Sequence, residues 1–167
     1  MDWGMRNRLA GILQPGTGRT VMLAVDHGYF LGPTTGLERP GETVAPLLQY
    51  ADSLMLTRGV LRNCVDPKEA PPVVLRVSGG SSILGELSNE ESTVSMRDAL
   101  RLNVAAIAHS IFVGSEFEKQ TLTNLSRLVD RAEGMGVPVL AVTAVGKDMV
   151  RDSRYLSLCC RIAAEMG

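Results

Sequence analysis

The sequence predicts an α/β fold built on a parallel sheet. Short apolar segments alternate with helical segments along the chain, and the apolar segments end in polar or glycine-rich residues. Strands that are apolar at successive positions are typical of a sheet covered by helices on both faces. A doubly wound open sheet and a closed (β/α)8 barrel both fit this pattern. No Gly-x-Gly-x-x-Gly follows the first strand, which argues against a dinucleotide-binding sheet.

The first part of the chain predicts two helices and two strands. Residues Trp3–Leu13 read as an amphipathic helix that ends before a Pro-Gly pair. The run Thr20–Val25 is long enough for one strand and too short for most helices. A helix is expected over Val44–Tyr50, and a short second strand over Ser53–Leu56.

The rest of the chain continues the alternation. The longest helix is expected to bury one face, because its apolar residues recur every three to four positions. In chain order, the expected elements are the strand Val73–Val77, the helix Thr93–Leu102, the strand Ala105–Val113, the helix Ser115–Met135, the strand Val137–Val142 and the helix Arg154–Met166.

These elements make about five strand-helix units in 167 residues. A complete (β/α)8 barrel usually needs around 250 residues. If the fold is a barrel, we expect residues 1–167 to be the N-terminal part of a single TIM-barrel domain, truncated to about five units.

The composition excludes several classes of protein. A formal net charge of −1 gives no electrostatic reason to expect nucleic acid or an anionic membrane as partner. No apolar run reaches the roughly 18 to 20 residues of a membrane-spanning helix, and the N-terminus does not read as a signal peptide. The three cysteines (Cys64, Cys159 and Cys160) fit neither a disulfide framework nor a zinc site. A reduced, cytoplasmic protein without a metal site is expected.

Polar residues at the end of the first strand are the leading candidates for chemistry. The run Thr20–Val25 passes directly into Asp26, His27 and Gly28. Adjacent titratable groups at the carboxyl end of a parallel strand are typical of an α/β active site. The alternative is that Asp26 caps the turn and that Gly28 supplies a positive φ.

The same segment carries a family resemblance. The stretch LAVDHGYFLGPTTGLE resembles the first barrel strand of class I aldolases that share an Ala-x-Asp-His-Gly motif. Together with DWGMRNRL, LTRG, ELSNE and AVTAVGKDMVRDSRY, it is similar to a thiolase subgroup of that family that acts in autoinducer-2 breakdown. The resemblance covers essentially the whole chain. It implies a TIM barrel, a Schiff-base lysine on the sixth strand and assembly as a homo-oligomer.

The three lysines of this chain do not match that nucleophile. Lys68 lies in a proline-rich loop and Lys119 in a helix beside two glutamates. Lys147 follows the fifth strand, where we expect it to bind a substrate anion; the alternative is a loop lysine paired with Asp148. The resemblance therefore implies that the Schiff-base lysine lies beyond Gly167, and that Asp26 is the catalytic acid/base of this segment.

Three further residues are candidates for substrate binding, each with a structural alternative. His27 is expected to donate to a substrate oxygen, unless it is a satisfied structural group. Arg58 is expected to contact an anion, with a structural salt bridge as the alternative. Ser78 opens a Ser-Gly-Gly-Ser-Ser run whose backbone N–H groups can line a pocket, and a flexible turn is the alternative. All should lie on the same face as Asp26.

The resemblance implies transfer of an acetyl group from a small phosphorylated hydroxy-diketone to coenzyme A, with no other cofactor. Aldolases of this family commonly carry Tyr-Pro-Arg-Gly after the fifth strand, where this chain has Thr-Ala-Val-Gly-Lys-Asp. The missing phenol favours the thiolase subgroup over a class I fructose-bisphosphate aldolase or a related synthase. A third possibility is an inactive barrel fragment, and the 167-residue chain alone is expected to be inactive.

Overall fold

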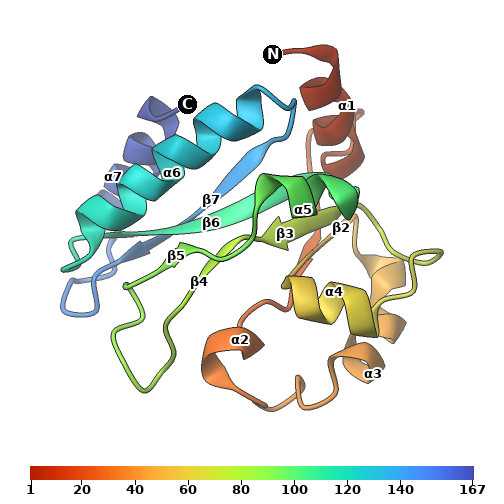
Figure 1. Cartoon of the computed structure of the whole chain (residues 1–167), viewed down its shortest axis with the longest axis horizontal. Coiled ribbons are helices and arrows are strands. Elements are labelled where there is room, and N and C mark those ends of the chain that lie inside the picture. Colours follow the sequence, from red (N-terminus) through yellow and green to blue (C-terminus); the bar gives the residue numbers. More distant parts are fainter.

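The computed structural model describes all residues 1–167. Its centre is a five-stranded sheet in which every neighbouring pair is parallel, in the order β1-β2-β3-β6-β7 (Figure 1). One edge of β1 and one edge of β7 have no partner strand. The strands are β1 (Met22–Ala24), β2 (Ser53–Leu56), β3 (Val73–Arg76), β6 (Ala106–Val113) and β7 (Val139–Val145).

Helices connect the strands, and a small hairpin follows β3. The hairpin is an antiparallel pair of two-residue strands, β4 (Ser78–Gly79) and β5 (Glu91–Ser92). The helices are α1 (Trp3–Ile12), α2 (Gly28–Leu31), α3 (Pro40–Val44), a 3-10 helix (Ala45–Tyr50), α4 (Arg58–Cys64), α5 (Met96–Arg101), α6 (Glu118–Glu133) and α7 (Ser153–Glu165). No helix is both long and apolar enough to cross a membrane.

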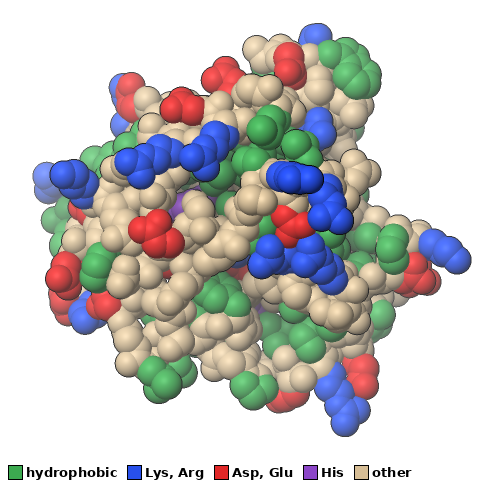
Figure 2. Space-filling view, in the orientation of Figure 1, with side chains coloured by type: hydrophobic (Ala, Val, Ile, Leu, Met, Phe, Trp, Pro, Cys, Tyr) green, Lys and Arg blue, Asp and Glu red, His purple; other side chains and the backbone are tan.

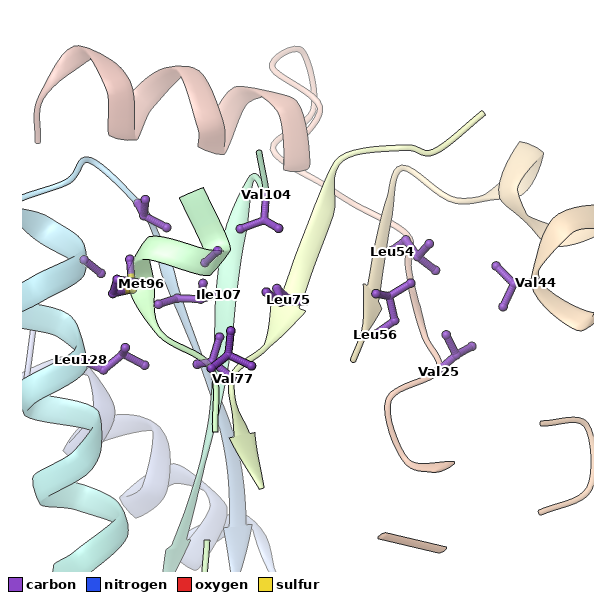
Figure 3. Packing of buried hydrophobic residues seen from close by; sticks show 14 of the residues in the cluster. Val25, Val44, Leu54, Leu56, Leu75, Val77, Met96, Val104, Ile107 and Leu128 are labelled. Atoms are coloured by element: carbon purple, nitrogen blue, oxygen red, sulfur yellow. The ribbon is translucent and has the colours of Figure 1, made fainter. Parts of the chain in front are cut away.

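The main core lies between the sheet and the helices that cover its outer face. Leu54, Leu56, Leu75 and Ile107 are fully buried there (Figure 3). Because side chains alternate along a strand, the residues between them point to the opposite, concave face. On that face Met55, Val74, Ala106 and Ala108 form a smaller cluster with Ile12 of α1. The concave face is therefore apolar in the middle of the strands.

The alternation predicted from the sequence is confirmed, with changes at the boundaries. The expected strand Thr20–Val25 contracts to three residues, because β1 pairs with β2 only from Met22 to Ala24. The expected strand Val137–Val142 is shifted, since β7 remains paired with β6 as far as Val145. The helix expected over Val44–Tyr50 is present as a 3-10 helix, Ala45–Tyr50, and a break in the α-helical hydrogen bonds after Val44 separates it from α3.

Pro46 explains that break. A proline has no N–H to donate within a helix, and its ring clashes with the carbonyl four residues earlier. The sequence predicts no helix between the strands Ser53–Leu56 and Val73–Val77, whereas the structure has α4 there, beginning at Arg58. The boundaries of the remaining elements shift by only a few residues. The expected helix Thr93–Leu102 is shortened to α5, because Ser95 caps its start by accepting a hydrogen bond from the N–H of Asp98.

Candidate active site

Polar side chains gather on the concave face at the carboxyl ends of β1 and β3, beside the middle of β6. The alternation that places Val74 and Ala108 on this face also places Arg76 and Ser110 there, two residues further on. Asp26 follows β1, two residues after Ala24. Charged residues thus follow apolar ones at the carboxyl ends of β1 and β3, and β6 places the hydroxyl of Ser110 beside Arg76. This is the end at which barrel enzymes carry their active sites.

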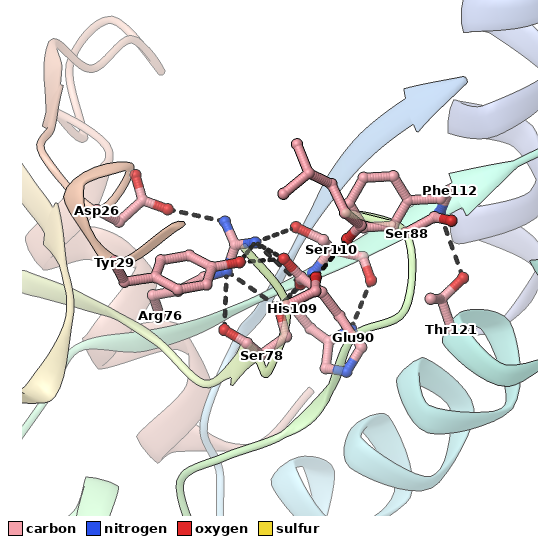
Figure 4. Close-up of polar contacts among 12 residues, drawn as sticks. Asp26, Tyr29, Arg76, Ser78, Ser88, Glu90, His109, Ser110, Phe112 and Thr121 are labelled. Carbon is pink, nitrogen blue, oxygen red and sulfur yellow. Dashed lines mark hydrogen bonds and ion pairs between the residues drawn. The ribbon is translucent and has the colours of Figure 1, made fainter. Parts of the chain in front are cut away.

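Arg76 is the centre of this group (Figure 4). Its guanidinium is only 5% exposed, and its Nη1 donates to Oδ2 of Asp26 at 2.7 Å. Its Nη2 lies 3.0 Å from both carboxylate oxygens of Glu90, and its Nε donates to Oγ of Ser78 at 3.0 Å. Nη2 also donates to Oγ of Ser110. One arginine thus connects residues from β1 to β6.

Glu90 is saturated with hydrogen bonds. Besides Arg76, it accepts from Oγ of Ser78 at 2.7 Å and from the hydroxyl of Tyr29. Tyr29 comes from α2, directly after the Asp-His-Gly motif, and its hydroxyl accepts from Nη2 of Arg76 at 3.2 Å. Burial and the hydrogen bond to Glu90 raise the pKa of the Tyr29 hydroxyl well above its usual range. Tyr29 therefore stays protonated and donates to Glu90.

Asp26 differs from Glu90 in keeping one oxygen free. Only its Oδ2 has a hydrogen-bond partner, and Oδ1 is unpaired without being fully buried. The side chain is 8% exposed and lines a cavity of about 440 Å³. A carboxylate that is fixed through one oxygen and accessible through the other can exchange a proton with a bound molecule.

The group carries an excess of negative charge. Two carboxylates, Asp26 and Glu90, face the single guanidinium of Arg76. Burial alone would lower the pKa of Arg76, but the negative charges of Glu90 and Asp26 raise it above its usual range. Arg76 therefore remains charged, and the formal charge of the three groups is −1. A positively charged group brought to this face would be stabilised.

Two cavities open beside the group. One, of about 200 Å³, is lined by residues that include Arg58, Arg76, Ser78 and Gly80. The other, of about 440 Å³, is lined by Asp26 and by the loop from Gly28 to Pro40. Tyr29 borders both cavities. A small molecule in either cavity can therefore contact one member of the Asp26–Arg76 pair.

The structure places the predicted site residues at the same end of the sheet, with different surroundings. Ser78 joins the buried group and also accepts from the backbone N–H of Ser110 at 3.0 Å. His27 is half-buried, precedes α2 and makes no side-chain cap hydrogen bond. Arg58 lines the smaller cavity, and its Nη1 donates to Oδ2 of Asp98 at 2.9 Å.

Lys147 lies in the loop after β7 and does not reach the buried group. Its Nζ donates to Oε2 of Glu86 at 2.9 Å, and its side chain is 72% exposed. The hydrogen bonds from Lys147 and Ser88 lower the pKa of Glu86 to about 2. The partner considered from the sequence was Asp148, whereas the ion pair in the structure joins this loop to the one between β4 and β5.

Four members of the group were not predicted as site residues: Tyr29, Arg76, Glu90 and Ser110. For Arg76 the sequence does hold a signal, because it is the only charged residue in the apolar run Val73–Val77. A charged residue inside an apolar strand is expected to be paired. Glu90 has no comparable signal, since it belongs to a polar loop with several other carboxylates and hydroxyls.

Comparisons with known proteins place the whole chain among curated sequences. The model of the DeoC/LacD family aldolases matches residues 20–167. The chain is 61% identical to a 3-hydroxy-5-phosphonooxypentane-2,4-dione thiolase of Enterobacter sp. strain 638. It is 59% identical to the protein of that name in Escherichia coli K12. Each match covers 100% of this chain and 57% of the relative, so the chain spans little more than half the length of these curated relatives.

Solved structures support the fold. A Schiff-base-forming fructose-1,6-bisphosphate aldolase superposes with a TM-score of 0.81, over 98% of this chain and 68% of its own, at 24% identity. A fructose-bisphosphate aldolase of Slackia heliotrinireducens gives a TM-score of 0.80 at 17% identity. The five parallel strands thus correspond to a half-barrel of the aldolase type, which resolves the choice between open sheet and barrel left by the sequence. The chain belongs to the DeoC/LacD family of aldolases.

Proposed function

We propose that this chain is the N-terminal part of a thiolase of the aldolase type, with Asp26 as its acid/base. The substrate proposed is 3-hydroxy-5-phosphonooxypentane-2,4-dione, after the name of relatives 59–61% identical over the whole chain. The single observation that carries the role of Asp26 is its geometry: Oδ2 is fixed by Arg76, while Oδ1 has no partner.

The proposed reaction breaks the bond between C2 and C3 of the dione. The acetyl carbon forms a bond to the sulfur of coenzyme A, and C3 takes the proton that the thiol gives up. The products are acetyl-coenzyme A and dihydroxyacetone phosphate. A Schiff base at C4, formed by a lysine beyond Gly167, would accept the electron pair released at C3.

Asp26 is proposed to move the proton between the thiol and C3 through its free oxygen. Arg76 keeps the carboxylate in one orientation, and Glu90 with Ser78 keeps Arg76 in place. The formal charge of −1 of the three ionic groups suits a positively charged iminium nearby, because opposite charges in a dry site attract strongly. Lys147 and His27 remain proposed contacts for the substrate phosphate and for a substrate oxygen.

A chimera tests the proposed function. In it, residues 1–167 are followed by the segment that the E. coli relative has beyond its match to this chain. We expect the chimera to form acetyl-coenzyme A from the dione and coenzyme A, and the isolated 167-residue chain to form none above background. A folded chimera that does not form acetyl-coenzyme A, while the intact E. coli relative does so in parallel, would contradict the proposal.

A further inference from the structure

A cluster of arginines lies on the outer surface over α4 and α5. Asp98 of α5 accepts from Nη1 of Arg58 at 2.9 Å and from Nη2 of Arg62 at 2.7 Å. Arg101, one turn further along α5, also acts on the Asp98 carboxylate by its charge. Figure 2 shows these positive groups gathered around one negative group on the face above α4 and α5. Arg58, Arg62 and Arg101 are named the arginine cluster below.

The arginine cluster keeps most of its capacity to bind an anion. Its three guanidinium groups face a single carboxylate, which leaves a formal charge of +2. The hydrogen bond from Arg58 lowers the pKa of Asp98, so this carboxylate stays ionised and holds two of the arginines close together. The side chains of Arg58 and Arg62 are 40% and 45% exposed. Each guanidinium has five N–H donors, and few of them are used by Asp98.

A cavity connects the cluster with the candidate active site. Arg58 belongs to the cluster and, together with Arg76, lines the cavity of about 200 Å³. The remaining lining is mainly polar or glycine, including Thr57, Ser78 and Gly80. Arg76 in turn holds Asp26. A ligand with its anionic end on the outer surface can therefore extend through this cavity toward the proposed acid/base.

We propose that the arginine cluster binds the phosphates of coenzyme A, and that the cavity receives its pantetheine arm. This inference rests on the proposed function. Coenzyme A carries several phosphates at one end, a thiol at the other and an amide-containing arm between them. Guanidinium groups bind phosphates through paired hydrogen bonds, and hydroxyl and backbone groups suit the amides. The phosphates, the amide-containing arm and the thiol follow one another along coenzyme A. The arginine cluster, the polar cavity and Asp26 follow one another in the same order in the structure.

The phosphate of the dione is a poorer match for this surface. In that substrate a single methylene separates the phosphate ester from the nearest ketone. Coenzyme A carries several phosphates, which three guanidinium groups can bind together, whereas the dione carries only one. The number of guanidinium groups therefore favours coenzyme A over the dione as the ligand of the cluster.

Binding measurements on the 167-residue chain and on the chimera test this assignment. Titration calorimetry would use coenzyme A, dephospho-coenzyme A, which lacks the 3′-phosphate, and dihydroxyacetone phosphate. We expect Arg62→Gln and Arg101→Gln each to weaken the binding of coenzyme A about tenfold, the size of one lost charge-assisted hydrogen bond. Loss of the 3′-phosphate should weaken binding similarly, and added salt should weaken it further.

Arg161→Gln is the matched control, because Arg161 is an exposed arginine on α7 paired with Glu165. It should leave the binding of coenzyme A unchanged. Binding that none of the cluster variants weakens, absence of binding by both chain and chimera, or displacement of coenzyme A by dihydroxyacetone phosphate would overturn the inference. An active chimera whose KM for coenzyme A does not rise with Arg62→Gln would overturn it as well, while the proposed function stands. If the cluster variants weaken the binding of coenzyme A but the chimera is inactive, the result would support this inference and contradict the proposed function.

Discussion

Arg76→Met should destabilise the 167-residue chain by about 3–5 kcal/mol, the range found when one partner of a buried ion pair is removed. Methionine fills a similar volume but leaves the carboxylates of Asp26 and Glu90 without a cation. Both carboxylates are almost fully buried, so their charges would be left with little solvation once the guanidinium is removed. Urea denaturation followed by circular dichroism measures this loss.

A variant that removes all three charges separates the ion pairs from other effects of Arg76. In Asp26→Asn/Arg76→Met/Glu90→Gln no charge remains unpaired, and groups of nearly the same shape are kept. Replacing a buried ionic group as a whole is often neutral, so we expect this variant to be more stable than Arg76→Met alone. Equal urea midpoints for Arg76→Met and the wild-type chain would show that the buried ion pairs are not formed in solution.

Asp26→Asn should lower the rate of acetyl-coenzyme A formation by the chimera about 10²–10⁴-fold, the usual contribution of a positioned acid/base. The asparagine side-chain oxygen can still accept from Nη1 of Arg76, which preserves the local geometry. It cannot take up or give a proton. The rate should therefore fall while the circular dichroism spectrum and the unfolding midpoint change little.

Asp52→Asn is the matched control for that variant. Asp52 directly precedes β2, so it lies at the opposite end of the sheet, where its carboxylate accepts from Gln14 and from the N–H of Val21. Residues at that end of a barrel are expected to stabilise the fold rather than to take part in catalysis. Equal losses of rate in the two variants would show that the Asp26 carboxylate has no special part in the reaction.

The fold and the position of Asp26 could be predicted because both follow from local patterns. An apolar run with few residues can form a buried strand, and its C-terminal polar residues must then lie at the carboxyl edge of the sheet. The strand Ser53–Leu56 was predicted with its observed bounds for this reason. The position of β1 was also predictable, but its length was not, because length depends on pairing with β2.

The partners of Asp26 could not be predicted in the same way. The bond between Arg76 and Asp26 joins residues 50 positions apart, and the bond between Arg58 and Asp98 joins residues 40 apart. Glu90 reaches Arg76 only because the β4–β5 hairpin turns the chain back. Such contacts depend on the tertiary fold, and no regular spacing of residues in the sequence indicates them. An isolated arginine in an apolar strand indicates that a partner exists, without indicating which residue it is.

Borohydride trapping of the 167-residue chain and of the chimera, each with the dione, tests most directly whether the nucleophile lies outside this segment. Reduction converts a Schiff base into a stable adduct, and peptide mapping by mass spectrometry identifies the modified lysine. We expect the adduct on a lysine after residue 167 of the chimera and none on the isolated chain, since Lys147 is exposed and paired with Glu86. An adduct on Lys147 of the isolated chain, with turnover well above background, would contradict the proposal that the nucleophile lies beyond Gly167.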